Sequence, residues 1–157
     1  MMKQVLIVYF SKFVVTQMVA ERAAQTVAGK LASADSVQLI NSSELDTSDL
    51  GVTDLVIMGT PTYNMNLPKV VKAVIEGLLR KALKGVRFGA FDTSYKMSWW
   101  LNHFTAAKRL ARKLSKLGGR RVVPPETFHV TGREGPLYEG ELERAGDWAN
   151  ILVTACV

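Results

Sequence analysis

The sequence predicts an α/β fold, a three-layer sandwich in which helices cover both faces of a five-stranded parallel sheet. Segments typical of strands alternate with segments typical of amphipathic helices along the whole chain, which is the order that crossovers between parallel strands require. Several strand segments are unbroken apolar runs, as expected for strands buried on both faces. The length of 157 residues suits one hydrophobic core, so we expect a single domain over residues 1–157.

The first strand leads directly into the first helix. Residues 5–10 form a continuous apolar run, which predicts a strand buried on both faces. The turn that follows, residues 11–16, aims the unpaired N–H groups of a helix N-terminus at whatever lies above the sheet, so it is a candidate anion site. Apolar residues then recur every four positions and predict one buried helical stripe: Val15, Val19, Ala23, Val27 and Leu31.

The later elements alternate in the same way. Strands are predicted at residues 36–40, 54–59, 86–91 and 120–130, and residues 41–51 read as a polar loop with a short helical piece. Helices are predicted from Pro68 to Gly85, from Asn102 to Leu117 and after Gly140. Pro124 and Pro125 interrupt the last strand. Because proline cannot donate to a ladder, that strand is expected to lie at a sheet edge, to bulge there, or to start after the prolines.

The expected strand order is 2-1-3-4-5, with the ligand site beyond the carboxyl ends of the strands, at the switch point between strands one and three. Three loops meet there, at residues 11–16, 60–67 and 92–100. The second loop contains Tyr63, which either stacks on a flat ring or merely covers a strand end. The third contains hydroxyl and N–H donors followed by Trp99 and Trp100, which either contact a ligand or pack structurally.

The composition limits the other functions to consider. Cys156 is the single cysteine, so the sequence contains no internal disulfide or cysteine-based metal site, and we expect a cytoplasmic protein. No apolar stretch approaches the roughly 20 residues that span a bilayer, so we expect no membrane partner. The sequence has no Ser/His/Asp or Cys/His set, no metal-ligand spacing and no dinucleotide or Walker glycine motif. We therefore assign no catalytic or metal-binding residue.

The net charge of +6 arises from a local excess of basic residues. These residues form either an ordinary solvated helix face or a docking surface for an acidic partner or a polyanion. Basic residues alone give only salt-sensitive contact with nucleic acid, so we expect no specific nucleic-acid partner. Eight of them lie between residues 93 and 125, where no acidic residue occurs: Lys96, Lys108, Arg109, Arg112, Lys113, Lys116, Arg120 and Arg121.

The chain resembles the flavodoxin family over essentially its whole length. The resemblance rests on Val5–Phe10 leading into Ser11, on Gly59–Tyr63 with Leu67-Pro68 after it, on Phe91–Thr93, and on a tail from Gly132 to Trp148. It implies electron transfer by FMN held non-covalently, with the phosphate on the first loop and the ring between the second and third loops. The residues that it places at the cofactor are Ser11, Lys12, Phe13, Val14, Val15, Thr16, Pro61, Thr62, Tyr63, Asn64, Asp92, Thr93, Ser94, Tyr95 and Trp100.

The first loop departs from the family pattern, which is Ser/Thr-x-Thr-Gly-x-Thr. Phe13 replaces a hydroxyl donor, and Val14 replaces a glycine, so a positive φ at residue 14 would suit this chain poorly. One lost hydroxyl bond to a charged group costs about 1.5–3 kcal/mol, and about 1.4 kcal/mol is tenfold in affinity. Ser11, Lys12, Thr16 and the helix dipole offset part of this loss. FMN binding that is weak or even absent is therefore compatible with the loop.

Three functions are compatible with these residues. The order of elements and the second and third loops favour an FMN-binding electron carrier over a stand-alone oxidoreductase. The second function is that of a flavodoxin-like scaffold that has lost tight FMN binding and serves as an interaction module; the apolar residues 13–15 suggest it. The third is an NAD(P)H-dependent flavin or quinone reductase, although the chain shows no separate nicotinamide-binding unit. Flavodoxins that act as mobile carriers are typically acidic, so this basic chain implies a redox partner with an acidic docking face.

Overall fold

The computed structural model describes residues 4–10, 14–31, 37–46, 50, 52–62, 66–78, 80–96, 105–132 and 134–156. The strands are β1 (Val5–Tyr9), β2 (Val37–Asn41), β3 (Leu55–Pro61), β4 (Arg87–Tyr95), β5 (Arg120–Arg121) and β6 (Glu126–Val130). The helices are α1 (Val14–Ala28), the 3-10 helix η2 (Ser42–Glu44), α3 (Lys69–Glu76), α4 (Ala106–Lys116) and α5 (Glu141–Cys156). Among the described residues, no helix is both long enough and apolar enough to cross a membrane.

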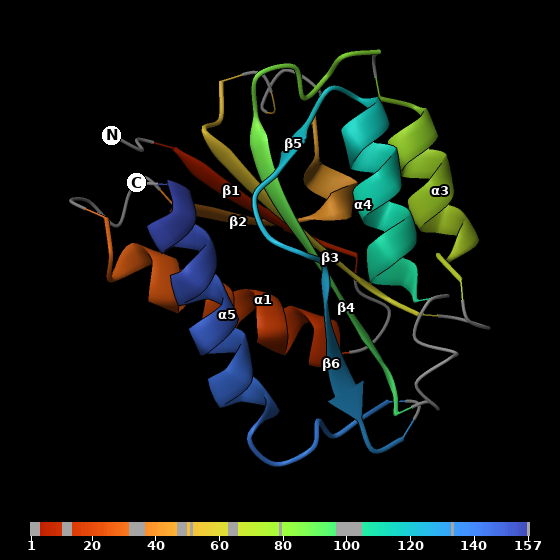
Figure 1. Ribbon diagram of the computed structural model, residues 1–157. Helices are drawn as coiled ribbons and strands as arrows, with labels where there is room; N and C mark the ends of the chain where they lie inside the picture. Colours follow the sequence, from red (N-terminus) through yellow and green to blue (C-terminus); the bar gives the residue numbers. More distant parts are fainter. Residues whose placement is uncertain are drawn as a thin grey trace.

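The strands form one parallel sheet of order β2-β1-β3-β4-β5, in which β6 also pairs with β4. Figure 1 shows the three layers, with α1 and α5 on one face of the sheet and α3 and α4 on the other. The predicted α/β fold and its strand order are therefore confirmed.

The edge of the sheet beside β4 is interrupted at the two prolines. β5 pairs with the start of β4, and β6 pairs with β4 again from Phe91 onward, opposite Glu126. Between these two pairings, four residues of the edge segment, 122–125, lie opposite only two residues of β4, 89–90. Pro124 and Pro125 lie in this excursion, outside the paired residues, which confirms the expected interruption at a sheet edge.

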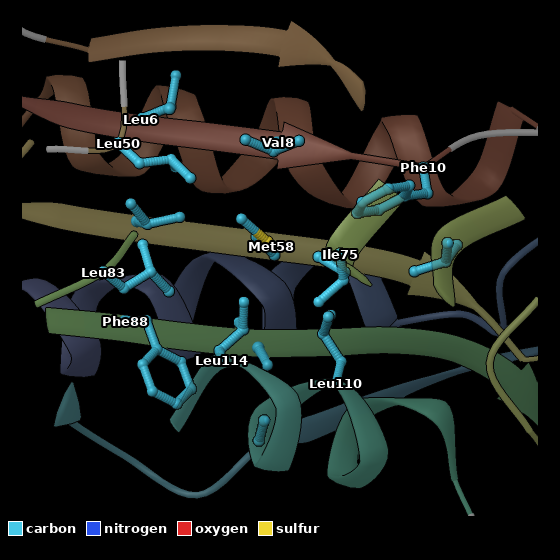
Figure 2. Packing of buried hydrophobic residues seen from close by; sticks show 14 of the residues in the cluster. Leu6, Val8, Phe10, Leu50, Met58, Ile75, Leu83, Phe88, Leu110 and Leu114 are labelled. Atoms are coloured by element: carbon cyan, nitrogen blue, oxygen red, sulfur yellow. The ribbon is translucent and has the colours of Figure 1, made fainter. Parts of the chain in front are cut away.

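The apolar runs supply hydrophobic side chains to both faces of the sheet, because successive strand residues point in opposite directions. Leu6 and Val8 of β1 belong to the core beneath α3 and α4, which Figure 2 shows with Met58, Ile75 and Leu110. The intervening residues of β1 belong to the opposite core, beneath α1 and α5, whose members include Val5, Ile7, Val19, Ala149 and Leu152.

Two predicted strand ends were wrong. β3 continues through Thr60 to Pro61, and β4 continues through Asp92 to Tyr95, so these residues lie in the sheet and not in the loops where they were expected. The polar residues of β4 read as a loop in the sequence because an unpaired buried carboxyl or hydroxyl group is costly. In the fold, Asp92 Oδ2 and the Thr93 hydroxyl find partners on neighbouring elements, Thr62 and Thr16, and the ladder to β3 extends as far as Thr93.

The helix predicted from Pro68 to Gly85 was also too long. α3 ends at Glu76, and Gly77, which lowers helix propensity, follows directly. Beyond it, the Leu83 N–H donates to the Leu117 carbonyl oxygen at 3.0 Å, which ties the turns after α3 to the end of α4. α4 begins at Ala106; the expected start at Asn102 lies outside the described residues.

Gly59 makes room for the ring of Phe91, its paired residue on β4. A Cβ atom added at Gly59 would lie 1.9 Å from the Phe91 ring, which is a severe overlap in the buried centre of the sheet. We expect Gly59→Ala to lower the free energy of unfolding by about 1–3 kcal/mol, measured by denaturant titration without added ligand. Gly29→Ala is the control, because its new Cβ would be 3.6 Å from its nearest neighbour.

Phe91→Leu should relieve this overlap, so the cost of Gly59→Ala should shrink when both changes are combined. If Gly59→Ala lowers the free energy of unfolding equally in the parent protein and in the Phe91→Leu variant, the packing argument is contradicted.

Candidate functional site

The carboxyl ends of the central strands bring a group of polar side chains together. Thr16 lies in the first turn of α1, Thr62 directly follows β3, and Asp92 and Thr93 lie in β4. Thr62 is half-buried and the other three are buried. Pro61 is paired with Thr93 in the ladder, and the Thr62 N–H donates to the Thr93 carbonyl oxygen at 3.0 Å, so the register itself places these residues side by side.

Asp92 is a fully buried carboxyl group at the N-terminus of α4. The Thr62 hydroxyl donates to Asp92 Oδ2 and accepts the N–H of Ala106 at 3.2 Å. Burial raises the pKa of Asp92 from 3.8 to about 6, and interactions with the Thr127 and Thr62 side chains and the N–H groups of Ala107 and Ala106 offset part of that penalty. The carboxyl group therefore takes the place at this helix N-terminus that suits an anion.

The N-terminus of α1 has no corresponding carboxyl group in its first turn. The Thr16 hydroxyl lies 2.8 Å from Thr93 Oγ1 in a buried contact that fixes this turn against β4. Val15 is buried, whereas Val14 is 65% exposed. The positive end of the α1 dipole is thus not neutralised within the first turn, and this helix end suits a phosphate.

The backbone conformation at Val14 is helical and does not require glycine. Val14 is the first residue of α1, and among the described residues Lys81 is the only non-glycine residue with a positive φ. Valine tolerates the helical region, so the condition under which Val14 would be strained is not met. The backbone of residue 14 therefore carries no cost for phosphate binding, and what this pair of residues lacks is a side-chain donor.

A loop outside the predicted site also lies beside the start of α1. A Cβ atom added at Gly135, which has a φ of +97°, would lie 2.5 Å from Val15 Cγ1, so the chain passes close to this helix end. Lys96 Nζ lies 4.4 Å from the centre of the Tyr138 ring, which joins the same loop to the end of β4. The glycine-rich stretch 132–140 signalled a loop in the sequence, but nothing in it indicated contact with α1.

A charged cluster holds β6 against α5. Arg144 Nη1 lies 2.7 Å from Glu126 Oε1, and Arg144 Nη2 lies 2.8 Å from Glu141 Oε2. Glu141 also accepts the His129 N–H at 2.6 Å. Burial alone would raise the pKa of Glu141, but the bonds from Arg144 and His129 keep that pKa below its ordinary value. This cluster positions the edge strand that carries Thr127 to Asp92.

The structure thus brings part of the predicted site together. Thr16, Thr62, Asp92 and Thr93 form the connected group described above. The Ser94 hydroxyl donates to the Tyr95 carbonyl oxygen at 3.3 Å, and the Tyr95 side chain is half exposed at the end of β4. The sequence did not identify Thr127, because its partner depends on the β4–β6 register. The remaining predicted residues lie outside the described residues: Ser11, Lys12, Phe13, Tyr63, Asn64 and Trp100.

A match between most of the chain and a family model decides the family. The model that describes flavodoxins matches residues 7–148, which run from the middle of β1 through all the other strands to the first half of α5. The chain belongs to the flavodoxin family. Flavodoxins bind FMN and transfer electrons to and from redox partners, and the strand order of this chain is the flavodoxin order.

Solved flavodoxin structures share this fold at low sequence identity. Flavodoxin 2 from Bacillus cereus is similar with a TM-score of 0.76 at 18% identity, covering 96% of this chain and 98% of the other. The flavodoxin of Streptococcus pneumonia TIGR4 is similar with a TM-score of 0.74 at 18% identity, over the same shares. The rubredoxin:oxygen oxidoreductase from Desulfovibrio gigas has a TM-score of 0.74 at 20% identity; the match covers 98% of this chain but 36% of that one. A search of curated proteins finds no significant match.

The buried carboxyl group of this flavodoxin should make its stability depend on pH. A carboxyl pKa raised from 3.8 to about 6 means that the folded state favours the protonated form, so Asp92 destabilises the fold increasingly as the pH rises from about 4 to about 6, and then by a constant amount. We expect the free energy of unfolding of Asp92→Asn, relative to that of the parent protein, to rise by about 3 kcal/mol over this pH range. Denaturant unfolding between pH 4 and pH 8, without added FMN, measures the difference.

Asp147→Asn controls for the loss of one negative charge, since Asp147 is exposed on α5. A stability difference between Asp92→Asn and the parent that is the same at every pH would show that burial does not perturb this carboxyl group.

Proposed function

We propose that this flavodoxin binds FMN with its phosphate at the start of α1 and its ring beside the ends of β3 and β4. In this assignment residues 11–16 hold the phosphate, with Lys12 as its cation and Ser11 as a hydroxyl donor. Residues 61–64, residues 92–95 and Trp100 surround the ring. Bound FMN supplies one- or two-electron redox chemistry, and the protein's part is to hold the cofactor and orient it towards a partner.

The single observation that carries this assignment is the contrast between two helix N-termini at the same sheet edge. The chain places its own carboxyl group, Asp92, at the N-terminus of α4, whereas the first turn of α1 contains no acidic residue. A phosphate dianion would gain from the N–H groups of the first turn of α1 and would be repelled from the end of α4 when Asp92 is ionised. Thr16, held by Thr93, keeps the first turn of α1 in one position for this purpose.

We further propose that residues 1–157 act as one domain, and that the protein works in the cytoplasm as a carrier for a partner with an acidic docking face. The support is the net charge of +6 and the run of eight basic residues without an acid between residues 93 and 125. Oppositely charged surfaces steer encounter and raise association rates, an advantage for a carrier that must meet its partner repeatedly.

A flavin titration tests the proposal. We expect the purified protein to show flavin absorption bands in the visible range or to acquire them on addition of micromolar FMN, with quenching of free-flavin fluorescence. The absence of both flavin bands and binding at micromolar FMN would refute the proposal and would favour a scaffold without flavin. Consumption of NADPH or NADH by the FMN-loaded protein with a quinone, and without a partner protein, would instead identify a reductase.

The first loop should limit the affinity for the phosphate. The double change Phe13→Thr and Val14→Gly adds one hydroxyl donor and clears two apolar side chains from the start of α1. Since one hydroxyl bond to a charged group contributes about 1.5–3 kcal/mol, we expect the Kd for FMN to fall by about tenfold or more. Fluorescence titration measures it.

Riboflavin is the matched control, because it has the same ring without the phosphate. The double change should leave the Kd for riboflavin unchanged. An equal gain for both ligands would show that residues 13 and 14 act on the ring and not on the phosphate.

A further inference from the structure

A basic groove runs along α4, on the side of the sheet edge that carries the two prolines. It has a volume of about 510 Å³. Figure 1 shows α4 beside the connection from β5 to β6, the two segments that supply its lining. The residues that line this groove are Lys108, Ala111, Arg112, Ser115, Lys116, Arg121, Pro124 and Pro125.

The four cations of the basic groove have no ion-pair partner among the described residues. Elsewhere on α4, by contrast, Lys113 Nζ lies 3.6 Å from Glu76 Oε1. Lys108, Arg112 and Lys116 follow one another at intervals of four residues, so they share one helix face. Like charges at this spacing repel one another, and Lys108 also lies in the first turn of α4, where a cation opposes the helix dipole. An anionic ligand in the groove would remove both unfavourable interactions.

The opposite wall makes the groove suited to an extended chain. The excursion of residues 122–125 carries Pro124 and Pro125 out of the β4 ladder, and they present rigid apolar rings without N–H groups. The three cations of α4 rise about 6 Å from one to the next. Alternate side chains of an extended peptide are about 6.5–7 Å apart and lie on one face. Acidic residues at alternate positions would therefore match the row of cations while the peptide stem packs on proline.

We propose that the basic groove binds an extended acidic segment of a partner protein, with acidic side chains at alternate positions. α4 begins beside Thr62, whose hydroxyl accepts the Ala106 N–H at 3.2 Å, so a segment in the groove reaches the edge of the sheet where the cofactor is proposed to bind. The identification of that partner as the redox partner rests on the proposed function; the binding of an acidic segment does not.

The groove fits a protein segment better than a nucleic acid. Proteins that bind single strands combine cations with aromatic side chains on which bases stack, and no aromatic residue lines this groove among the described residues. The row of cations spans about 12 Å, the length of about four extended residues.

The test uses the whole protein and a dye-labelled peptide of sequence Ser-Glu-Ser-Glu-Ser-Glu-Ser. In about 50 mM salt we expect a Kd below about 1 mM, with amide shifts in NMR spectra at residues 108–121. The triple variant K108Q/R112Q/K116Q should bind about tenfold more weakly. The variant K30Q/K69Q/K72Q removes the same charge at two exposed and one half-buried lysine that do not line the groove, and it should bind as the parent does.

Equal weakening in the two triple variants, or amide shifts spread over the surface, would overturn the proposal in favour of a diffuse charge effect. Tighter binding of an eight-nucleotide single-stranded DNA than of the peptide, lost in K108Q/R112Q/K116Q, would overturn it in favour of a nucleic-acid site. The FMN affinity of each variant is measured alongside. Normal FMN binding without peptide binding refutes the groove alone, whereas peptide binding without FMN binding refutes the proposed function alone.

Discussion

The burial of β4 on both faces, beyond the end of its apolar run, is the constraint on which the carboxyl edge of this flavodoxin depends. Extending the strand to Tyr95 carries a carboxyl group and two hydroxyl groups into the interior, and buried polar groups need partners. Asp92 accepts a hydrogen bond from the Thr62 hydroxyl and interacts with the N–H groups at the start of α4. The Thr93 hydroxyl is hydrogen-bonded to Thr16 of α1. The polar contacts that make this strand possible therefore also fix where two helices begin.

This arrangement gives the two helix ends different roles. Asp92 supplies α4 with a negative charge, at the cost of a raised pKa because the carboxyl group is buried. The first turn of α1 receives only a hydroxyl contact from β4 and contains no acidic residue. Two N-termini at one sheet edge would otherwise compete for the same anion. The chain's own carboxyl group, Asp92, lies at the start of α4, whereas no acidic residue lies in the first turn of α1, which is why we propose the phosphate there.

The sequence predicted the layers and the strand order because apolar periodicity is local. The run at residues 5–10 serves both cores, and the helical stripe of α1 is buried as its spacing indicated. The end of β4 could not be predicted in this way. Residues 92–94 have the composition of a loop, and only contacts distant in sequence, such as Thr62 and Thr127, make their burial tolerable. The family pattern raised the question of a positive φ at residue 14, and only the structure shows that Val14 begins α1 with a helical backbone.

Pro124 and Pro125 show how one local feature separates two surfaces. In a central strand they would remove ladder bonds, but at the edge they lie where the ladder is interrupted, between the Val122 N–H, which still donates to the Phe88 carbonyl oxygen, and Glu126, where pairing resumes. Pairing then resumes at Glu126, which Arg144 holds, so the excursion does not displace Thr127 from Asp92. The gap between this excursion and α4 is lined by cations that have no ion-pair partner in the part of the chain that the structure describes. This edge of the sheet thus supports the buried Asp92 through β6, while β5 and the two prolines line the basic groove. Charge changes in the groove should therefore leave the contacts at the carboxyl edge undisturbed, because the cations that line it take no part in those contacts.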